Sequence, residues 1–218
     1  MMMRRYSSVE DLPATLPVFP LTGAVLLPRG ELPLNIFEAR YLAMVDDALK
    51  GDRLIGMIQP AEHEDKVLTP ALSKVGCAGR ITSFREAEDA RVLITLTGIC
   101  RFEVAEQLAV KTAYRQIRPD YGRFLGDLVA DSATDFPRDR LMVALKSYLY
   151  RRDLKADWRS VMDAPPEILV NALVMLCPFD PAEKQALVEA PSWPERVDTL
   201  VAILEMSAAA QPENRSLN

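Results

Sequence analysis

Histidine and cysteine are scarce in this chain, which limits the chemistry its side chains can perform. Among 218 residues there is one histidine, His63, and there are three cysteines. His63 stands among acidic residues in a polar segment, but neighbouring side chains of an exposed loop point in different directions and do not form a metal site. A cysteine nucleophile would depend on the same single histidine as its partner. We therefore expect no metal ion and no thiol catalysis.

The chain also lacks the features of a secreted protein. Its three cysteines cannot all pair, and each stands in an apolar context typical of a small core residue. Two arginines near the start are not followed by the apolar segment and small-residue cleavage site of a signal peptide. These observations predict a cytoplasmic protein with three buried cysteines: Cys77, Cys100 and Cys177.

Neither a membrane span nor a nucleic-acid surface is expected. The longest apolar stretch, residues 168–177, is interrupted by Asn171 and is much shorter than the roughly 20 residues that cross a bilayer. The formal net charge is −5, and the lysines and arginines form no dense run. Binding to nucleic-acid phosphates requires clustered cations, so the composition argues against it.

The glycines do not form a nucleotide-binding loop. None of the 9 glycines precedes a lysine, whereas a phosphate loop combines free backbone amides with a lysine that meets the phosphate charge. Ser73 and Lys74 are adjacent, but they stand in a polar segment that offers nothing to activate a serine. We assign no catalytic residue and no cofactor, and we expect the protein not to be an enzyme.

The first half of the chain has the pattern of a β-rich domain. Residues 16–44 hold short apolar runs separated by prolines, which favour edges, turns and helix entries over central strands. Residues 54–60 predict a buried strand, and alternation within 80–99 predicts a hairpin. Two further strand candidates lie within 102–121. The prolines of the first segment are Pro17, Pro20, Pro28 and Pro33.

One helix is expected inside this half, over about residues 35–50. Asn35 would accept free amides at its start, Glu38 would reach back from three residues on, and Gly51 would end it. Apolar residues that recur at the spacing of one helix face are Phe37, Tyr41, Met44, Val45 and Ala48.

Beyond residue 124 the pattern becomes helical. At four positions a capping side chain is followed by a proline in the first turn, which satisfies free amides and presets the backbone. This predicts an α+β chain with a β domain over 1–124, a helical bundle over 125–206 and a disordered tail over 207–218. The capping residues are Asp135, Asp163, Asp180 and Ser192.

Three segments resemble the Lon N-terminal domain family, the substrate-recognition region of the ATP-dependent Lon protease, which also occurs as a stand-alone bacterial protein. The first segment is LPVFPLTGAVLLPRGELPLNIFEARY, and the second is VGCAGRITSFREAEDARVLITLTGICRFEV with its Gly98-to-Arg101 turn. The third is similar to the family's helical pattern LP…KQ…LLE…ER, with Cys177 interrupting the Leu-Pro pair and Val188 in place of the second leucine. Its matching residues are Leu176, Pro178, Lys184, Gln185, Leu187, Glu189, Glu195 and Arg196.

The resemblance implies a PUA-like antiparallel β pseudo-barrel followed by an α-helical bundle. It also implies a non-catalytic module that binds unfolded or tagged polypeptide segments, or a protease or chaperone, without Lon's ATPase and Ser-Lys protease domains. An adaptor, a holdase and a regulator would each fit. The alternative is a small-molecule or RNA binder that uses the barrel, as related barrels do in RNA-modifying proteins, although the acidic charge counts against RNA.

Five side chains are candidates for partner binding. Glu38 would either cap its helix or rim a binding surface with Arg40, which would otherwise lie over the barrel. Arg101, beyond the glycine turn, would either satisfy carbonyls of that turn or meet a partner's carboxylate. The candidates are Phe37, Glu38, Arg40, Tyr41 and Arg101.

Overall fold

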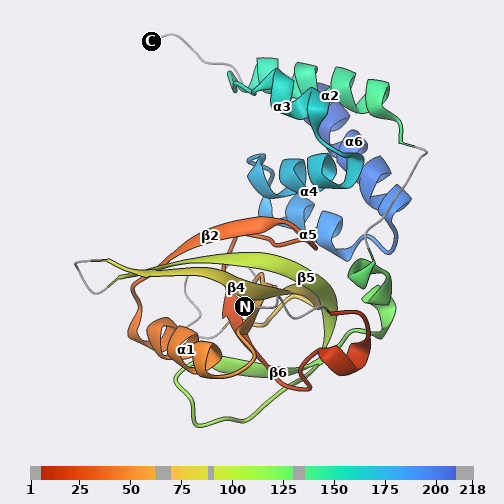
Figure 1. Cartoon of the computed structure of the whole chain (residues 1–218). Helices are drawn as coiled ribbons and strands as arrows, with labels where there is room; N and C mark the ends of the chain where they lie inside the picture. Colours follow the sequence, from red (N-terminus) through yellow and green to blue (C-terminus); the bar gives the residue numbers. More distant parts are fainter. Residues whose placement is uncertain (1–5, 62–69, 88–90, 130–135, 210–218) are drawn as a thin grey trace.

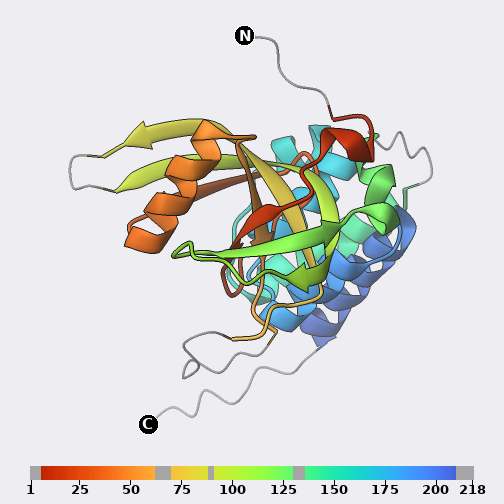
Figure 2. The same ribbon diagram turned by 90° about the horizontal axis from the view of Figure 1, so that it is seen from below.

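The computed structural model describes residues 6–61, 70–87, 91–129 and 136–209 (Figure 1). A β-barrel carries the helices of the second half of the chain on one side, and α1 lies against the barrel away from them (Figures 1 and 2). The elements are η1 (Val9–Asp11), β1 (Leu16–Pro20), β2 (Glu31–Ile36), α1 (Ala39–Lys50), β3 (Leu54–Ile58), β4 (Val75–Glu86), β5 (Val92–Gln107), β6 (Arg115–Asp120), η2 (Gly122–Leu128), α2 (Arg138–Arg151), α3 (Trp158–Asp163), α4 (Pro166–Leu176), α5 (Pro181–Glu189) and α6 (Trp193–Ala209).

The long strand β5 connects most of the barrel. Its first part pairs with β2, most of its length with β4, and its last part with β6. The strand order is β2-β5-β4-β3-β1-β6, and the additional β5–β6 pairing closes the sheet. The α+β class is therefore confirmed. One pair differs from the antiparallel expectation: β1 and β3 run parallel, because the chain between them crosses over through β2 and α1.

The start of α1 differs from the sequence prediction. Asn35 is not its capping residue, because it lies in β2 and pairs with Leu93 of β5. Burial of the apolar residues on either side of Asn35 extends the strand and outweighs the local capping signal. The helix begins at Ala39, after an extended Glu38 whose side chain makes no cap hydrogen bond. It ends before Gly51, as predicted.

In the described part of the chain, five α-helices follow the barrel rather than four. The additional helix is α3, whose capping residue Asp157 accepts the amides of Arg159 and Ser160. The prediction missed it because it has only 6 residues and no proline in its first turn. Asp180 caps α5 through a capping box, as predicted. The predicted cap Asp135 lies outside the described residues.

A single hydrophobic cluster extends from the barrel interior into the helices. Leu16 and Phe102 of the barrel and Leu145 and Leu200 of the helices belong to it, and all four are fully buried. A smaller cluster packs α1 against the barrel. α6 runs into the segment predicted as a tail, and residues 210–218 lie outside the described part. None of the described helices is long and apolar enough to span a membrane.

Gly98 on β5 allows the loop before β2 to lie directly on the barrel. Its amide donates to the Gly30 carbonyl at 2.9 Å, and its carbonyl accepts the Arg29 amide at 2.8 Å. A Cβ atom built at Gly98 would lie 2.0 Å from the Leu27 carbonyl oxygen. Since this neighbour is backbone, it cannot rotate away.

We predict that Gly98→Ala lowers the free energy of unfolding by roughly 3 kcal/mol, because the loop or the strand must move to accept the methyl group. Urea unfolding followed by circular dichroism would measure the loss. Gly126→Ala is the matched control, since a Cβ there meets no atom within 4 Å. Equal stability of the two variants would contradict this account of the contact.

Candidate functional site

An apolar groove lies beside α4, bounded by α2, α3 and the α2–α3 connection. Its volume is about 480 Å³. Leu154, Ile168 and Leu176 line it while remaining 38%, 43% and 81% exposed, so that it opens to solvent. We call this cavity the α4 groove. Its deeper lining includes Leu145, Leu149, Leu169 and Leu173.

A second hollow of about 300 Å³ lies on the other side of α4, against the loop that enters β2. Ile168, Ala172 and Leu176 line both cavities. Because these residues are spaced four apart, they form one stripe along the helix. The stripe is therefore an apolar ridge with a hollow on each side.

α4 buries a polar side chain and leaves some of its apolar side chains exposed. Asn171 is the only polar residue between Glu167 and the end of the helix. It is 1% exposed, and its side-chain amide donates to the Pro28 carbonyl of the barrel at 2.9 Å. Most amphipathic helices have the opposite arrangement, so the exposed face of α4 is unusually apolar for a surface in contact with water.

The wall formed by α3 is fixed at both ends. Asp157 caps its start. Arg138, the first residue of α2, donates to the carbonyls of Val161 at 2.8 Å and Met162 at 2.6 Å near its end. These bonds satisfy carbonyls that a short helix leaves free. They keep α3 beside α4 although α3 has no fully buried residue of its own.

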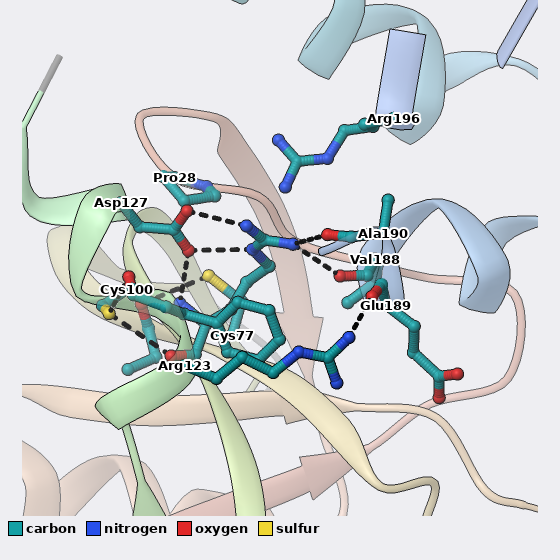
Figure 3. A network of polar contacts seen from close by, with 12 residues as sticks. Pro28, Cys77, Cys100, Arg123, Asp127, Val188, Glu189, Ala190 and Arg196 are labelled. Carbon is teal, nitrogen blue, oxygen red and sulfur yellow. Dashed lines mark hydrogen bonds and ion pairs between the residues drawn. The ribbon is translucent and has the colours of Figure 1, made fainter. Parts of the chain in front are cut away.

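A buried ion pair joins the barrel to the helices (Figure 3). Arg101 of β5 binds Asp127 of η2 in a bidentate manner, with distances of 2.8 and 2.9 Å. Its remaining guanidinium nitrogen donates to the carbonyls of Val188 at 3.0 Å and Ala190 at 2.6 Å. The plane of Arg101 stacks over Phe124, 4.2 Å from the ring centre. One side chain thus connects β5, η2 and the α5–α6 turn.

Further polar contacts fix α4 and α5 on the barrel. The Lys184 ammonium donates to the carbonyls of Gly23 at 2.9 Å and Met175 at 3.2 Å. Arg29, next to the barrel, forms an ion pair with Glu167 at the start of α4. These contacts fix the position of the apolar ridge relative to the loop that enters β2.

The structure corrects the prediction for Arg101. This residue is only 3% exposed, so it does not face a partner on the surface. The sequence reasoning left two alternatives, the carbonyls of its own turn or a partner's carboxylate. The carboxylate and the carbonyls that Arg101 contacts belong instead to other parts of the same chain. Long-range packing of η2 and α5 supplies them, which local sequence does not reveal.

The other four candidates lie together at the start of α1, away from the α4 groove. Phe37 is 66% exposed, and Glu38 forms an exposed ion pair with Arg40 at 2.7 Å. Tyr41 is buried and packs against Phe19 with ring centres 4.2 Å apart. Of these four, Phe37, Glu38 and Arg40 could reach a partner, whereas Tyr41 fills the core.

The cysteines are free and buried, as predicted. Burial raises the pKa of the Cys100 thiol to about 12 and that of Cys177 to about 11, and it raises the pKa of Cys77 as well. Within the described residues no group of acidic, cysteine and histidine side chains could hold a metal ion. His63 lies outside those residues.

Comparisons with known proteins agree with the resemblance seen in the sequence. The family model of the ATP-dependent protease La (LON) substrate-binding domain matches residues 15–206. Lon protease 2 of Myxococcus xanthus is 32% identical over 113 residues, which are 51% of this chain and 13% of that protein. Lon protease 2 of Thermus thermophilus is 24% identical over 208 residues, or 91% of this chain and 25% of that protein.

Two solved structures have the same fold. A Lon N-terminal domain protein from Xanthomonas campestris superposes with a TM-score of 0.58 at 22% identity, covering 86% of this chain and 97% of that one. The N-terminal domain of Mycobacterium avium complex Lon protease gives a TM-score of 0.60 at 17% identity, covering 87% and 97%. The chain thus corresponds to nearly the whole of each structure, but to a quarter or less of the length of the two Lon proteases compared.

We predict that Asp127→Asn lowers the free energy of unfolding by about 3 kcal/mol or more, because Arg101 keeps its buried charge without a carboxylate. Glu205→Gln is the matched control: it removes the partner of Arg140 in an exposed ion pair, so it should change stability very little. Chemical unfolding of both variants measures the difference. Equal losses in the free energy of unfolding would show that the buried ion pair stabilises the fold no more than the exposed one.

The thiols should be inert in the folded protein. At about pH 8 iodoacetamide should modify none of them, and in concentrated guanidinium chloride it should modify all, because burial keeps them protonated and covered. The folded-state pKa of Cys100, about 12, exceeds its unfolded value of roughly 8.5. The contribution of Cys100 to the free energy of unfolding is therefore complete below about pH 8.5, the unfolded-state pKa, and is lost as the pH rises from there toward 12. Mass spectrometry would detect any early modification, which would contradict the burial.

Proposed function

The chain belongs to the ATP-dependent protease La (LON) substrate-binding domain family, and from this we propose that it is a non-catalytic module that binds exposed apolar segments of polypeptides. The α4 groove is the proposed binding site. The observation that carries this proposal is the outward-facing apolar ridge of α4, with Leu176 81% exposed between two hollows. Exposed apolar surface of this kind is typical of interaction sites.

An unfolded polypeptide is the occupant that best suits this geometry. The groove and the second hollow lie on either side of one ridge, so an extended segment could place apolar side chains in both. Burying one leucine or phenylalanine side chain contributes roughly 1.5–3 kcal/mol. Ordering the bound segment opposes this gain. We therefore expect weak binding with little sequence preference, which suits a module that samples many unfolded chains for a protease or a chaperone.

A binding role inside the barrel has less support. Leu16 and Phe102 fill its interior and are fully buried. At Gly56 an added Cβ would lie 2.8 Å from Leu16 and 3.1 Å from Phe102, so this region is tightly packed. The proposed non-catalytic character agrees with the raised pKa of the cysteine thiols, which keeps them protonated.

We predict that Leu176→Glu weakens binding of fluorescein-labelled casein at least about fivefold, since a charge on the ridge must be desolvated by an apolar segment. Fluorescence anisotropy would measure the affinity. Leu176 is mostly exposed, so the variant should unfold at nearly the wild-type temperature.

Two control variants locate the site. Val143→Glu changes a residue that is 68% exposed on α2 and lines a different cavity, so casein binding should persist. Phe37→Glu tests the surface predicted from the sequence. If Phe37→Glu loses casein binding and Leu176→Glu keeps it, the binding site lies at the start of α1. If both variants bind casein as the wild type does, neither surface is the binding site.

A further inference from the structure

A small cavity lies at the junction of the barrel, η2 and the start of α6. It has a volume of about 160 Å³ and is separate from the α4 groove. Four arginines and two carboxylates line it, which gives two positive charges in excess. Arg123 and Ser192, both exposed, stand at its rim. The charged residues are Arg29, Arg101, Arg123, Arg196, Asp127 and Glu167.

The two carboxylates of this cavity are already engaged. Both oxygens of Asp127 accept hydrogen bonds from Arg101, and both oxygens of Glu167 accept from Arg29. At the rim, Arg123 pairs with Glu103 at 2.8 Å. Each of these three arginines therefore has a carboxylate partner.

Arg196 differs from the other three arginines. It is 3% exposed, and Figure 3 shows its guanidinium extending from α6 toward the side on which Asp127 lies. Its Nε donates to the Leu187 carbonyl at 3.2 Å and its Nη1 to the Asn171 side-chain oxygen at 3.5 Å. Among the described residues its Nη2 has no hydrogen-bond partner, and no ion pair of Arg196 is found there.

A buried guanidinium with a free donor is costly unless an anion balances it. Burial and repulsion from Arg101 lower the pKa of Arg196 to about 10. Because this value is still well above 7, Arg196 is charged at neutral pH. The first turn of α6 adds the positive end of a long helix at the same place. Glu195, in the same turn, is exposed and accepts from Ser192 at 3.0 Å instead of turning into the cavity.

We propose that this cavity binds a small oxyanion, with the size of phosphate or of a carboxylate, through the free donor of Arg196. The volume suits this ligand, since a water molecule takes about 30 Å³ in the liquid and the cavity has room for only a few. Guanidinium groups bind oxyanions with directed, charge-assisted hydrogen bonds. Such an anion would lie between Arg101 of the barrel and Arg196 of the helices, and it would hold these two parts together.

The test uses phosphate as the probe, in the full chain at constant ionic strength set with sodium chloride. The chain has 2 tryptophans, and Trp193 lines the cavity whereas Trp158 does not. In Trp158→Phe, phosphate should change the Trp193 fluorescence in a saturable manner, and in the wild type it should raise the melting temperature. A response to phosphate no different from that to chloride would overturn the proposal.

Variants assign the response to Arg196. Arg196→Gln should weaken phosphate binding at least about tenfold, which corresponds to about 1.4 kcal/mol. Arg140→Gln, at an exposed ion pair on α2, should bind as the wild type does. If Arg196→Gln does not fold, Arg123→Gln at the exposed rim should still weaken binding severalfold. Wild-type affinity in the folded Arg196→Gln variant, or in Arg123→Gln where that variant must replace it, would overturn the assignment.

The source of the anion follows from a second measurement. A labelled peptide with a free C-terminal carboxylate is compared with the same peptide amidated, each with and without phosphate. Tighter binding of the free acid, abolished by phosphate, would identify a polypeptide terminus as the ligand. Equal binding of the two peptides, with the phosphate response intact, would identify a free ion. Leu176→Glu should leave the phosphate response unchanged. A failure of the proposed polypeptide binding at the α4 groove can therefore be told apart from a failure of the proposed anion site.

Discussion

The contact between Arg101 and Asp127 is the constraint on which the relation of barrel and helices depends. Each of the donor groups of Arg101 that faces the junction meets a partner, and these partners come from η2 and from the α5–α6 turn. A buried charge tolerates little displacement, because any lost partner leaves it unpaired in a medium of low polarity. The hydrophobic cluster shared by the two parts supplies stability, and this pair supplies a defined geometry. α4, with its exposed ridge, is fixed on the same barrel by its own contacts with Pro28 and Arg29.

The ridge of α4 shows how a helix can keep apolar side chains exposed and still be packed firmly on the rest of the molecule. A helix that is apolar on most faces is usually buried. Here Asn171 and Glu167 attach α4 to the loop around Pro28 and Arg29 through polar contacts, and leucines on its inner side join the core. Ile168 and Leu176 remain outside. Polar groups therefore position the helix, and apolar groups are left available for a ligand.

The sequence predicted the fold class, the hairpin, the buried cysteines and the cap of α5, because these depend on local periodicity or on short capping patterns. It misplaced the start of α1, since pairing of Asn35 with β5 overrides a capping signal that looks sound in isolation. For Arg101 it left open whether the side chain satisfies the carbonyls of its own turn or meets a partner's carboxylate. The partners of this residue lie 26 and 87 or more positions away in the chain, so no local pattern marks them. The α4 groove was missed for a similar reason: a run such as ILVNALVML predicts burial, and only tertiary packing decides which of its faces stays in water.

The closure of the barrel sets the order in which the chain can reach its folded state. β1 pairs with β6, so that Leu16 lies opposite Ile117. The interior they enclose is continuous with residues as late as Leu204. During synthesis, the edge of β1 that pairs with β6 therefore stays uncovered until about a hundred further residues have been made. Contacts between residues so far apart in the sequence form slowly. The apolar faces of the first strands are therefore exposed to aggregation until the helices that cover them have been synthesised.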